Sequence, residues 1–238
     1  MDIIMNYIKI DGVDSREFGF YAYEREVHTG AERVYEDVVI LGRNGSVKLD
    51  TQRYANVPHS YDLICYDRAE RHIKELRAFV ASLIGYRRLE DSYENDYYYI
   101  ACFEGGLEPT LSRDRNKAKV KLEFTRKPER YLKIGEEPIV LTESSTLVNP
   151  TLYQSKPIIK AYGGSGFSLN GNAVNISAST DYVGIDSESM ECYYMDQSMN
   201  ANVSLQNNEY PILQSGTNVF ELTSGTTKLE IIPRWYTL

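Results

Sequence analysis

Residues 117–124 alternate strictly between charged and apolar side chains, and this period restricts the fold more than any other feature of the chain. Lysine and glutamate occupy one set of alternate positions, and alanine, valine, leucine and phenylalanine occupy the other. Successive side chains of a strand point to opposite faces, so the pattern predicts a strand with one buried face. We expect it to end at Arg126-Lys127-Pro128, because proline cannot donate to a ladder.

One segment, residues 68–84, has the period of a helix instead. Its apolar side chains Ile73, Leu76, Val80 and Leu83 fall on a single face. We expect Asp67 to cap the start of the helix and Gly85 to follow its end. A helix with one apolar face packs against a sheet rather than inside a bundle.

The remaining apolar runs are short, as in strands, and residues 34–41, 61–66 and 97–103 are the clearest of the first half. Beyond residue 134 the chain is rich in Asn, Ser, Thr and Gly, and its apolar runs have the spacing of a sandwich or barrel. Charge changes at the same place. Residues 1–135 hold 22 basic and 23 acidic side chains, whereas residues 136–238 hold 4 and 11. We therefore predict a mainly β protein with two domains, residues 1–133 and 134–238.

Several function classes are disfavoured by composition and motifs. A net charge of −8 opposes nucleic-acid binding, no apolar run is long enough to span a bilayer, and no secretory signal is visible. Nucleotide-binding and hydrolase motifs are missing, so no motif points to a cofactor or to catalytic residues, and a pair of carboxylates for glycoside hydrolysis is left open, because such residues meet only in three dimensions. We also expect no metal site, because neither the cysteines nor the histidines have the spacing of metal ligands: Cys65, Cys102, Cys192, His28, His59 and His72. The thiols are expected to be buried, since each cysteine lies in an apolar or aromatic run. We expect His72 on the exposed face of the helix.

Two groups of residues are candidates for binding. The loop of residues 104–116 is long for a hairpin connection and is either a partner-binding surface or a mobile hairpin tip; its charged residues are Arg113, Asp114 and Arg115.

Aromatic side chains form the second group, and tyrosine supplies 20 of the aromatic residues of the chain. Four aromatic side chains are candidates for a platform that stacks on a sugar ring: Trp235, Tyr236, Tyr193 and Tyr194. A core position for Trp235 is the favoured alternative, because tryptophan is highly buried on average.

The acidic residues 90–96 lack the glycine and glutamate of a calcium loop and predict a turn between two strands.

The order of short motifs along nearly the whole chain resembles the distal tail protein family of long-tailed, non-contractile bacteriophages. The first half contributes Asp11-Gly12-Val13-Asp14-Ser15-Arg16-Glu17-Phe18-Gly19-Phe20, Leu41-Gly42-Arg43-Asn44-Gly45-Ser46 and Phe124-Thr125-Arg126-Lys127-Pro128. The second half contributes Asn149-Pro150-Thr151, Leu169-Asn170-Gly171 and Tyr210-Pro211-Ile212-Leu213-Gln214-Ser215-Gly216-Thr217-Asn218.

The resemblance implies a structural protein of the virion and not an enzyme. Its N-terminal domain, related to the tail-tube subunit, would form a homohexameric hub ring, and its C-terminal domain would be a galectin-like β-sandwich. The ring would join the tail tube to a tail-associated or spike protein, carry receptor-binding proteins, and let DNA pass without specific binding. It would be assembled in the host bacterial cytoplasm, with a prophage origin left open. The runner-up is a carbohydrate-binding module that contributes to adsorption on host surface glycans, and a glycan-cleaving enzyme comes third.

Overall fold

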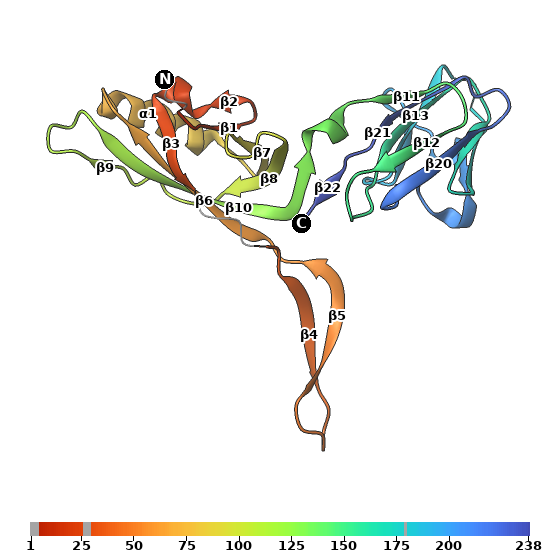
Figure 1. Ribbon diagram of the computed structural model, residues 1–238, viewed down its shortest axis with the longest axis horizontal. Coiled ribbons are helices and arrows are strands. Elements are labelled where there is room, and N and C mark those ends of the chain that lie inside the picture. The colour runs from red at the N-terminus through yellow and green to blue at the C-terminus, as the bar shows by residue number, and fades with distance from the viewer. Residues whose placement is uncertain (1–4, 26–29, 179) are drawn as a thin grey trace. The chain divides into compact units, whose positions relative to one another are not determined.

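The computed structural model describes residues 5–25, 30–178 and 180–238, and the chain divides into two compact units (Figure 1). The first unit is Met1–Arg130 together with Leu238, and the second is Tyr131–Thr237. Each unit has its own cluster of buried apolar side chains. The predicted mainly β fold with one α-helix is confirmed. Among the described residues, no helix is long and apolar enough to cross a membrane.

The first unit is built on one antiparallel sheet. Its strands, in spatial order, are β2 (Val13–Asp14), β1 (Ile8–Ile10), β7 (Tyr86–Asp91), β8 (Tyr97–Phe103), β10 (Ala118–Leu132), β6 (Val57–Cys65) and β3 (Phe20–Arg25), with β9 (Thr110–Leu111) also paired to β10. A 3-10 helix, η1 (Ser15–Phe18), lies between β2 and β3. The expected strand at residues 97–103 coincides with β8.

Strand β10 is longer than its alternating stretch predicts, because it continues through Pro128. Its pairing with β6 ends at Arg126, opposite Val57. Since Pro128 lies beyond that register, its missing N–H group removes no hydrogen bond from the β6 ladder. The expected end at Arg126-Lys127-Pro128 is therefore wrong.

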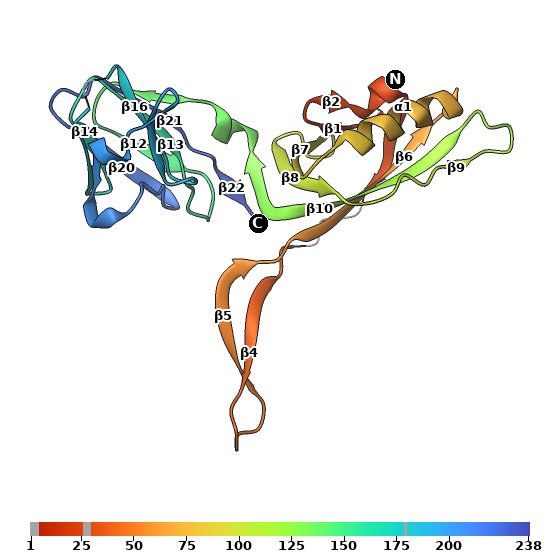
Figure 2. The ribbon, with the colours of Figure 1, turned by 180° about the vertical axis from the view of Figure 1, so that it is seen from behind.

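Helix α1 (Ala69–Ser82) covers one face of this sheet (Figure 2). Ile73, Leu76 and Val80 of the helix and the apolar side chains of β10, such as Val120 and Leu122, belong to one buried cluster. The charged side chains at the alternate positions of β10 are exposed on the opposite face. The alternation read from the sequence is thus confirmed at the level of side-chain burial.

The start of α1 differs from the prediction. Arg68, not Asp67, is the capping residue; its φ of 46° lies in the left-handed region, and its side chain makes no capping bond. Asn116 accepts the hydrogen bonds of the backbone N–H groups at the start of the helix instead. Its side-chain oxygen accepts from the Arg68 N–H group at 2.9 Å, and its backbone carbonyl accepts from the Ala69 N–H group at 3.2 Å. The cap comes from a loop distant in sequence, so no local motif predicts it.

Strands β4 (Arg33–Val39) and β5 (Ser46–Tyr54) form a separate two-stranded ribbon (Figure 1). The turn uses left-handed Gly42 and Gly45, with φ of 80° and 81°. The Arg43-Asn44-Gly45 segment is a tight-turn signal in the sequence, and the structure places the turn there.

The second unit consists of two sheets that share one buried cluster, as expected for a sandwich. Ile159, Ile185 and Ile231 come from one sheet, and Phe167 and Phe220 come from the other. The first sheet has the order β11 (Ile139–Leu141), β21 (Lys228–Ile232), β13 (Ile158–Tyr162), β16 (Tyr182–Asp186), β17 (Glu191–Tyr194) and β18 (Gln197–Ser198). The second has the order β12 (Ser145–Asn149), β20 (Gly216–Leu222), β14 (Gly166–Leu169), β15 (Asn172–Ile176) and β19 (Val203–Leu205). The unit also contains η2 (Lys133–Glu136), η3 (Asn200–Asn202), η4 (Gln206–Asn208) and β22 (Tyr236–Thr237).

Strands β14 and β15 are joined by Asn170 and Gly171, whose φ angles of 52° and 82° are those of a tight hairpin turn. An Asn-Gly dipeptide between two apolar runs is a strong short-range sequence signal for a hairpin, and the structure forms one here.

Candidate interaction surfaces

The turn end of the β4–β5 ribbon carries exposed apolar side chains. We call residues 38–41 the hairpin tip: Val38, Val39, Ile40 and Leu41. Val39 is 77% exposed and Leu41 is 98% exposed. Contiguous apolar surface on a soluble protein marks an interaction site, and a two-stranded ribbon is marginally stable by itself. The sequence predicts a strand here, but only the structure reveals that both of its faces are uncovered.

Polar contacts along the ribbon keep the hairpin tip in register. Arg33 donates from Nε to the Asp50 carboxylate at 2.9 Å, and Ser46 donates to Asp37 at 2.8 Å. These hydrogen bonds hold the pKa of both carboxyl groups below its usual value. The ribbon is therefore a defined surface and not an unstructured loop.

A second apolar surface lies on the sheet of the first unit. We call it the sheet groove; it has a volume of about 270 Å³ and is lined by Ile64, Thr110, Leu111, Ser112, Lys117, Ala118 and Lys119. Most of its lining belongs to β6, β9 and β10. Its walls are apolar, with two lysines at the rim, so it suits a small apolar side chain of a partner.

The predicted loop of residues 104–116 is an ordered turn at its charged end. Asp114 accepts hydrogen bonds from the Ser112 hydroxyl at 2.5 Å and from the Asn116 N–H at 3.2 Å. Arg115 lies 3.4 Å from Glu70 of α1. Arg113 is exposed. Asp114 and Arg115 thus stabilise the loop that caps α1, and a binding role for the three residues stays a prediction.

The four aromatic candidates do not share one surface role. Trp235 is 6% exposed and belongs to the buried cluster of the second unit, so its ring is not available to a sugar. This is the core position that the sequence favours. Tyr236 stacks on Tyr153, with ring centroids 5.7 Å apart, whereas Tyr194 meets Tyr182 edge-on at 5.1 Å.

Tyr193 and Tyr194 lie on β17, in a sheet with further tyrosines. A methyl group at Gly184 would lie 2.5 Å from the ring of Tyr193, so only glycine allows this ring to cover β16. Tyr162 and Tyr182 are 5.5 Å apart, and the Lys228 ammonium lies 3.9 Å from the Tyr162 ring. We call Tyr162, Tyr182 and Tyr194 the tyrosine patch. Sequence spacing gives no sign of it, because its members come from three strands.

The acidic turn predicted at residues 90–96 joins β7 to β8 and is confirmed. Asp91 is buried and accepts hydrogen bonds from the Tyr61 hydroxyl at 2.5 Å and from the backbone of Tyr93 and Glu94. Glu94 accepts from the Tyr99 hydroxyl at 2.7 Å. Burial, reinforced by these carboxylates, raises the pKa of Tyr61 and Tyr99. Two buried tyrosines thus serve as hydrogen-bond donors in the core.

The prediction that His72 lies on the exposed face of the helix is wrong, and His59 is buried. His59 is 2% exposed, with its ring 4.7 Å from that of Tyr61. The His72 side chain is 19% exposed because Gly19 packs on it. His28 lies outside the described residues.

Two of the three cysteines are buried as expected. Cys65 and Cys192 are buried, and burial raises the pKa of both thiols, whereas Cys102 is half-buried.

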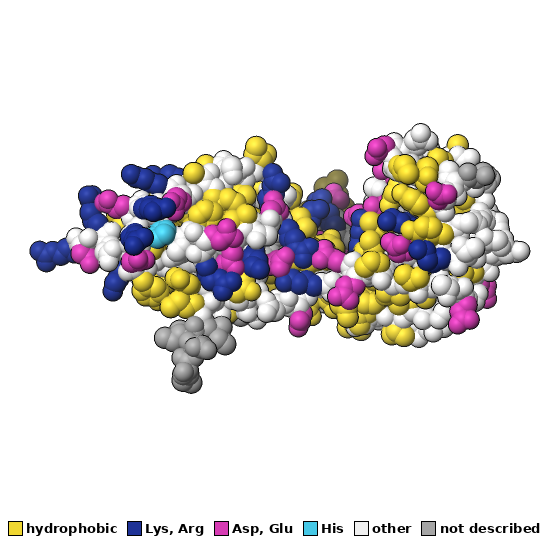
Figure 3. All heavy atoms as spheres, turned by 90° about the horizontal axis from the view of Figure 1, so that it is seen from above, with side chains coloured by type: hydrophobic (Ala, Val, Ile, Leu, Met, Phe, Trp, Pro, Cys, Tyr) yellow, Lys and Arg dark blue, Asp and Glu magenta, His cyan; other side chains and the backbone are white. Residues whose placement is uncertain are grey.

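Charged side chains follow the division seen in the sequence. Basic and acidic groups are interspersed over the first unit, and basic groups are sparser on the second (Figure 3). The first unit therefore offers both signs of charge for matching to a partner, and the second is mainly acidic.

Comparison with solved structures places the fold. The Dit protein of phage SPP1, described as a paradigm of the hub adsorption apparatus in phages that infect Gram-positive bacteria, superposes with a TM-score of 0.71 at 14% identity, over 98% of this chain and 99% of that one. A chain of the phage p2 baseplate, solved in its activated conformation with strontium, gives 0.50 at 11% identity, over 95% and 97%. Neither a protein-family model nor a curated protein matches the sequence. At these identities the similarity shows that both units share the fold of phage hub and baseplate proteins.

Proposed function

We propose that this chain is a structural component of a bacteriophage tail tip, the subunit of a hexameric hub ring. The observation that carries the proposal is the similarity to the SPP1 Dit protein over 98% of this chain. The role is architectural and not enzymatic. The ring joins the tail tube to the tail-associated or spike protein, supports the receptor-binding apparatus and leaves a channel for DNA. In this proposal residues 1–133 form the ring and residues 134–238 form a galectin-like sandwich.

Closing a ring requires two different surfaces on each subunit that complement each other. The first unit offers such a pair, the hairpin tip and the sheet groove. Both are apolar, and a valine or leucine side chain suits the size of the groove. We therefore assign the subunit contact to the hairpin tip of one copy in the sheet groove of the next.

The charge of the chain suits a conduit. Six copies carry 6 × −8 = −48, which disfavours tight binding of DNA during its passage. The acidic second unit repels its neighbours and helps to keep six projecting domains apart. We place the protein in the virion, assembled in the host cytoplasm, and leave a prophage origin of its gene open.

The assembly state is the direct test. Light scattering on the purified protein, alone and with a tail-tube or spike partner, should give six times 27.3 kDa, about 164 kDa. Electron micrographs should show six-fold rings with a central opening. A chain that stays at 27.3 kDa at high concentration, even with its partners, contradicts the proposal.

A second function, binding of host surface glycans, is favoured by the tyrosine patch. Its three rings are half-exposed and lie beside Lys160 and Lys228. Aromatic faces flanked by polar groups suit a sugar ring. Glycan-array binding that is lost in Tyr194→Ala supports this function, and an array without signal for the wild-type protein opposes it.

A further inference from the structure

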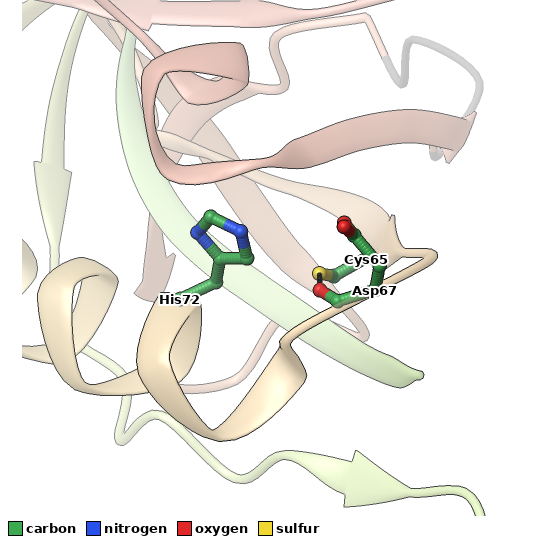
Figure 4. Close-up of side chains that lie close together, drawn as sticks. All are labelled: Cys65, Asp67 and His72. Carbon is green, nitrogen blue, oxygen red and sulfur yellow. Dashed lines mark hydrogen bonds between the residues drawn. The ribbon is translucent and has the colours of Figure 1, made fainter. Parts of the chain in front are cut away.

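Three side chains with metal-ligating atoms meet where β6 passes into α1. Cys65 is the last residue of β6, Asp67 follows in the link, and His72 lies in α1. One ligand atom from each side chain lies within 4.8 Å of the other two. The imidazole and the Asp67 carboxylate lie on either side of the Cys65 sulfur (Figure 4). The fold therefore brings together a thiol, an imidazole and a carboxylate that no sequence motif connects.

The surroundings hold the imidazole in place. A Cβ built on Gly19 would lie 2.9–3.0 Å from three consecutive ring atoms of His72, which places Gly19 over the flat face of the ring. The in-plane lone pair of Nε2, on the side of Cys65 and Asp67 in Figure 4, is left open by this contact. On the other side, Nδ1 lies 3.6 Å from the Glu75 carboxylate. A carboxylate is one of the groups that accept a hydrogen bond from the second nitrogen of a metal-bound histidine, and Glu75 lies just beyond hydrogen-bond distance here.

The sulfur is fixed as well. Cys65 is fully buried, and its thiol donates to the Asp67 carbonyl oxygen at 2.9 Å. The Asp67 side chain is 67% exposed and can change its rotamer at little cost. Ligand atoms in a tetrahedral zinc site are about 3.5 Å apart, as follows from the usual bond lengths. The three ligand atoms, within 4.8 Å of one another here, therefore have to approach by roughly 1 Å when an ion binds, and the exposed Asp67 side chain can contribute to this by rotation.

We propose that Cys65, Asp67 and His72 bind a zinc ion, with a water molecule as the fourth ligand. Thiolate, imidazole and carboxylate are the zinc-binding side chains of proteins, and a thiolate disfavours magnesium and calcium. On binding, the Cys65 thiol loses its proton to solvent and forms the sulfur–metal bond. The ion joins β6 to α1, the two layers of the first core, so its effect is on stability. The inference does not depend on ring assembly.

Cobalt(II) titration of the untagged, chelator-treated full-length protein tests the site. We expect one equivalent of cobalt to produce a thiolate-to-cobalt charge-transfer band in the near ultraviolet, which zinc then removes. Cys65→Ser should abolish the band, and the matched variant Cys102→Ser should keep it. Glu75→Gln should keep the band but weaken affinity about 10- to 100-fold. A wild-type protein without the band, or a band that survives Cys65→Ser, overturns the proposal.

Thermal melting gives a second measurement that does not depend on a buried substitution. Asp67 is exposed, so Asp67→Asn is expected to fold normally. Zinc should raise the melting temperature of the wild-type protein and shift that of Asp67→Asn much less. Equal shifts in both proteins contradict the assignment of Asp67 as a ligand.

Discussion

Charging the hairpin tip should prevent the chain from assembling while leaving its fold intact. We choose the double variant Val39→Asp/Leu41→Asp, because these side chains are 77% and 98% exposed and contribute little to the isolated subunit. Full burial of such a side chain in an interface contributes about 1.5–3 kcal/mol. Scaled by the two exposures, the pair contributes about 3–5 kcal/mol to each subunit contact. This corresponds to an association constant about 10²–10⁴-fold lower in the variant.

Light scattering over a concentration series measures this change. The wild-type protein should remain near 164 kDa, six times 27.3 kDa, at concentrations where the double variant is monomeric. The matched control is Leu152→Asp, since Leu152 is 88% exposed but lies in the second unit. Circular dichroism spectra should be the same for all three proteins, whereas the double variant should melt below the other two because it lacks the stabilisation by assembly. If the double variant assembles as well as the control, the hairpin tip is not the ring contact.

Mixing two variants tests the pairing of the hairpin tip with the sheet groove. Leu111→Asp places a charge in the sheet groove and should also give monomers. A mixture of Leu111→Asp with the hairpin variant contains one intact tip and one intact groove. It should therefore form a dimer of about 55 kDa, twice 27.3 kDa, and nothing larger. A mixture that remains monomeric, or that closes into rings, refutes the tip-in-groove contact.

Three further predictions concern the stability of the two units. Tyr61→Phe removes a hydroxyl that donates to a buried carboxylate, so the free energy of unfolding should fall by about 1.5–3 kcal/mol in urea titrations; no change would mean that this bond contributes nothing. Burial raises the pKa of Asp186, but hydrogen bonds from Arg234 bring this pKa below its usual value. The stability that the Asp186 carboxylate contributes is therefore complete above about pH 5 and is lost as the pH falls through about 4 and below. The difference in urea midpoint between the wild-type protein and Asp186→Asn should therefore shrink between about pH 5 and pH 3, and a constant difference would contradict this reasoning. Gly135→Ala places a Cβ 2.6 Å from the backbone nitrogen of Trp235 and should lower the free energy of unfolding by about 1–3 kcal/mol, measured by thermal melting. The control Gly106→Ala, with open space around it, should be near neutral, and equal melting temperatures for the two variants would show that the clash is relieved freely.

Local regularities account for the parts of the fold that the chain itself predicts. The alternation of residues 117–124 and the helical period of residues 68–84 each bury the expected face. Such patterns are determined by the geometry of one element, since period 2 or 3.6 places side chains on one side whatever lies opposite. The tight turn at Asn170-Gly171 is similarly a property of two residues that accept positive φ.

Contacts between distant segments account for what the sequence leaves open. Asn116 caps α1 in place of Asp67, the hairpin tip stays uncovered, and Cys65 meets His72, although no period or motif connects any of these residues. Each depends on which strands become neighbours, and that choice is made by the packing of whole layers. The sequence by itself thus determined the β-rich elements, the single helix and their buried faces. Only the tertiary structure decided which surfaces remain exposed for a partner and which polar side chains come together.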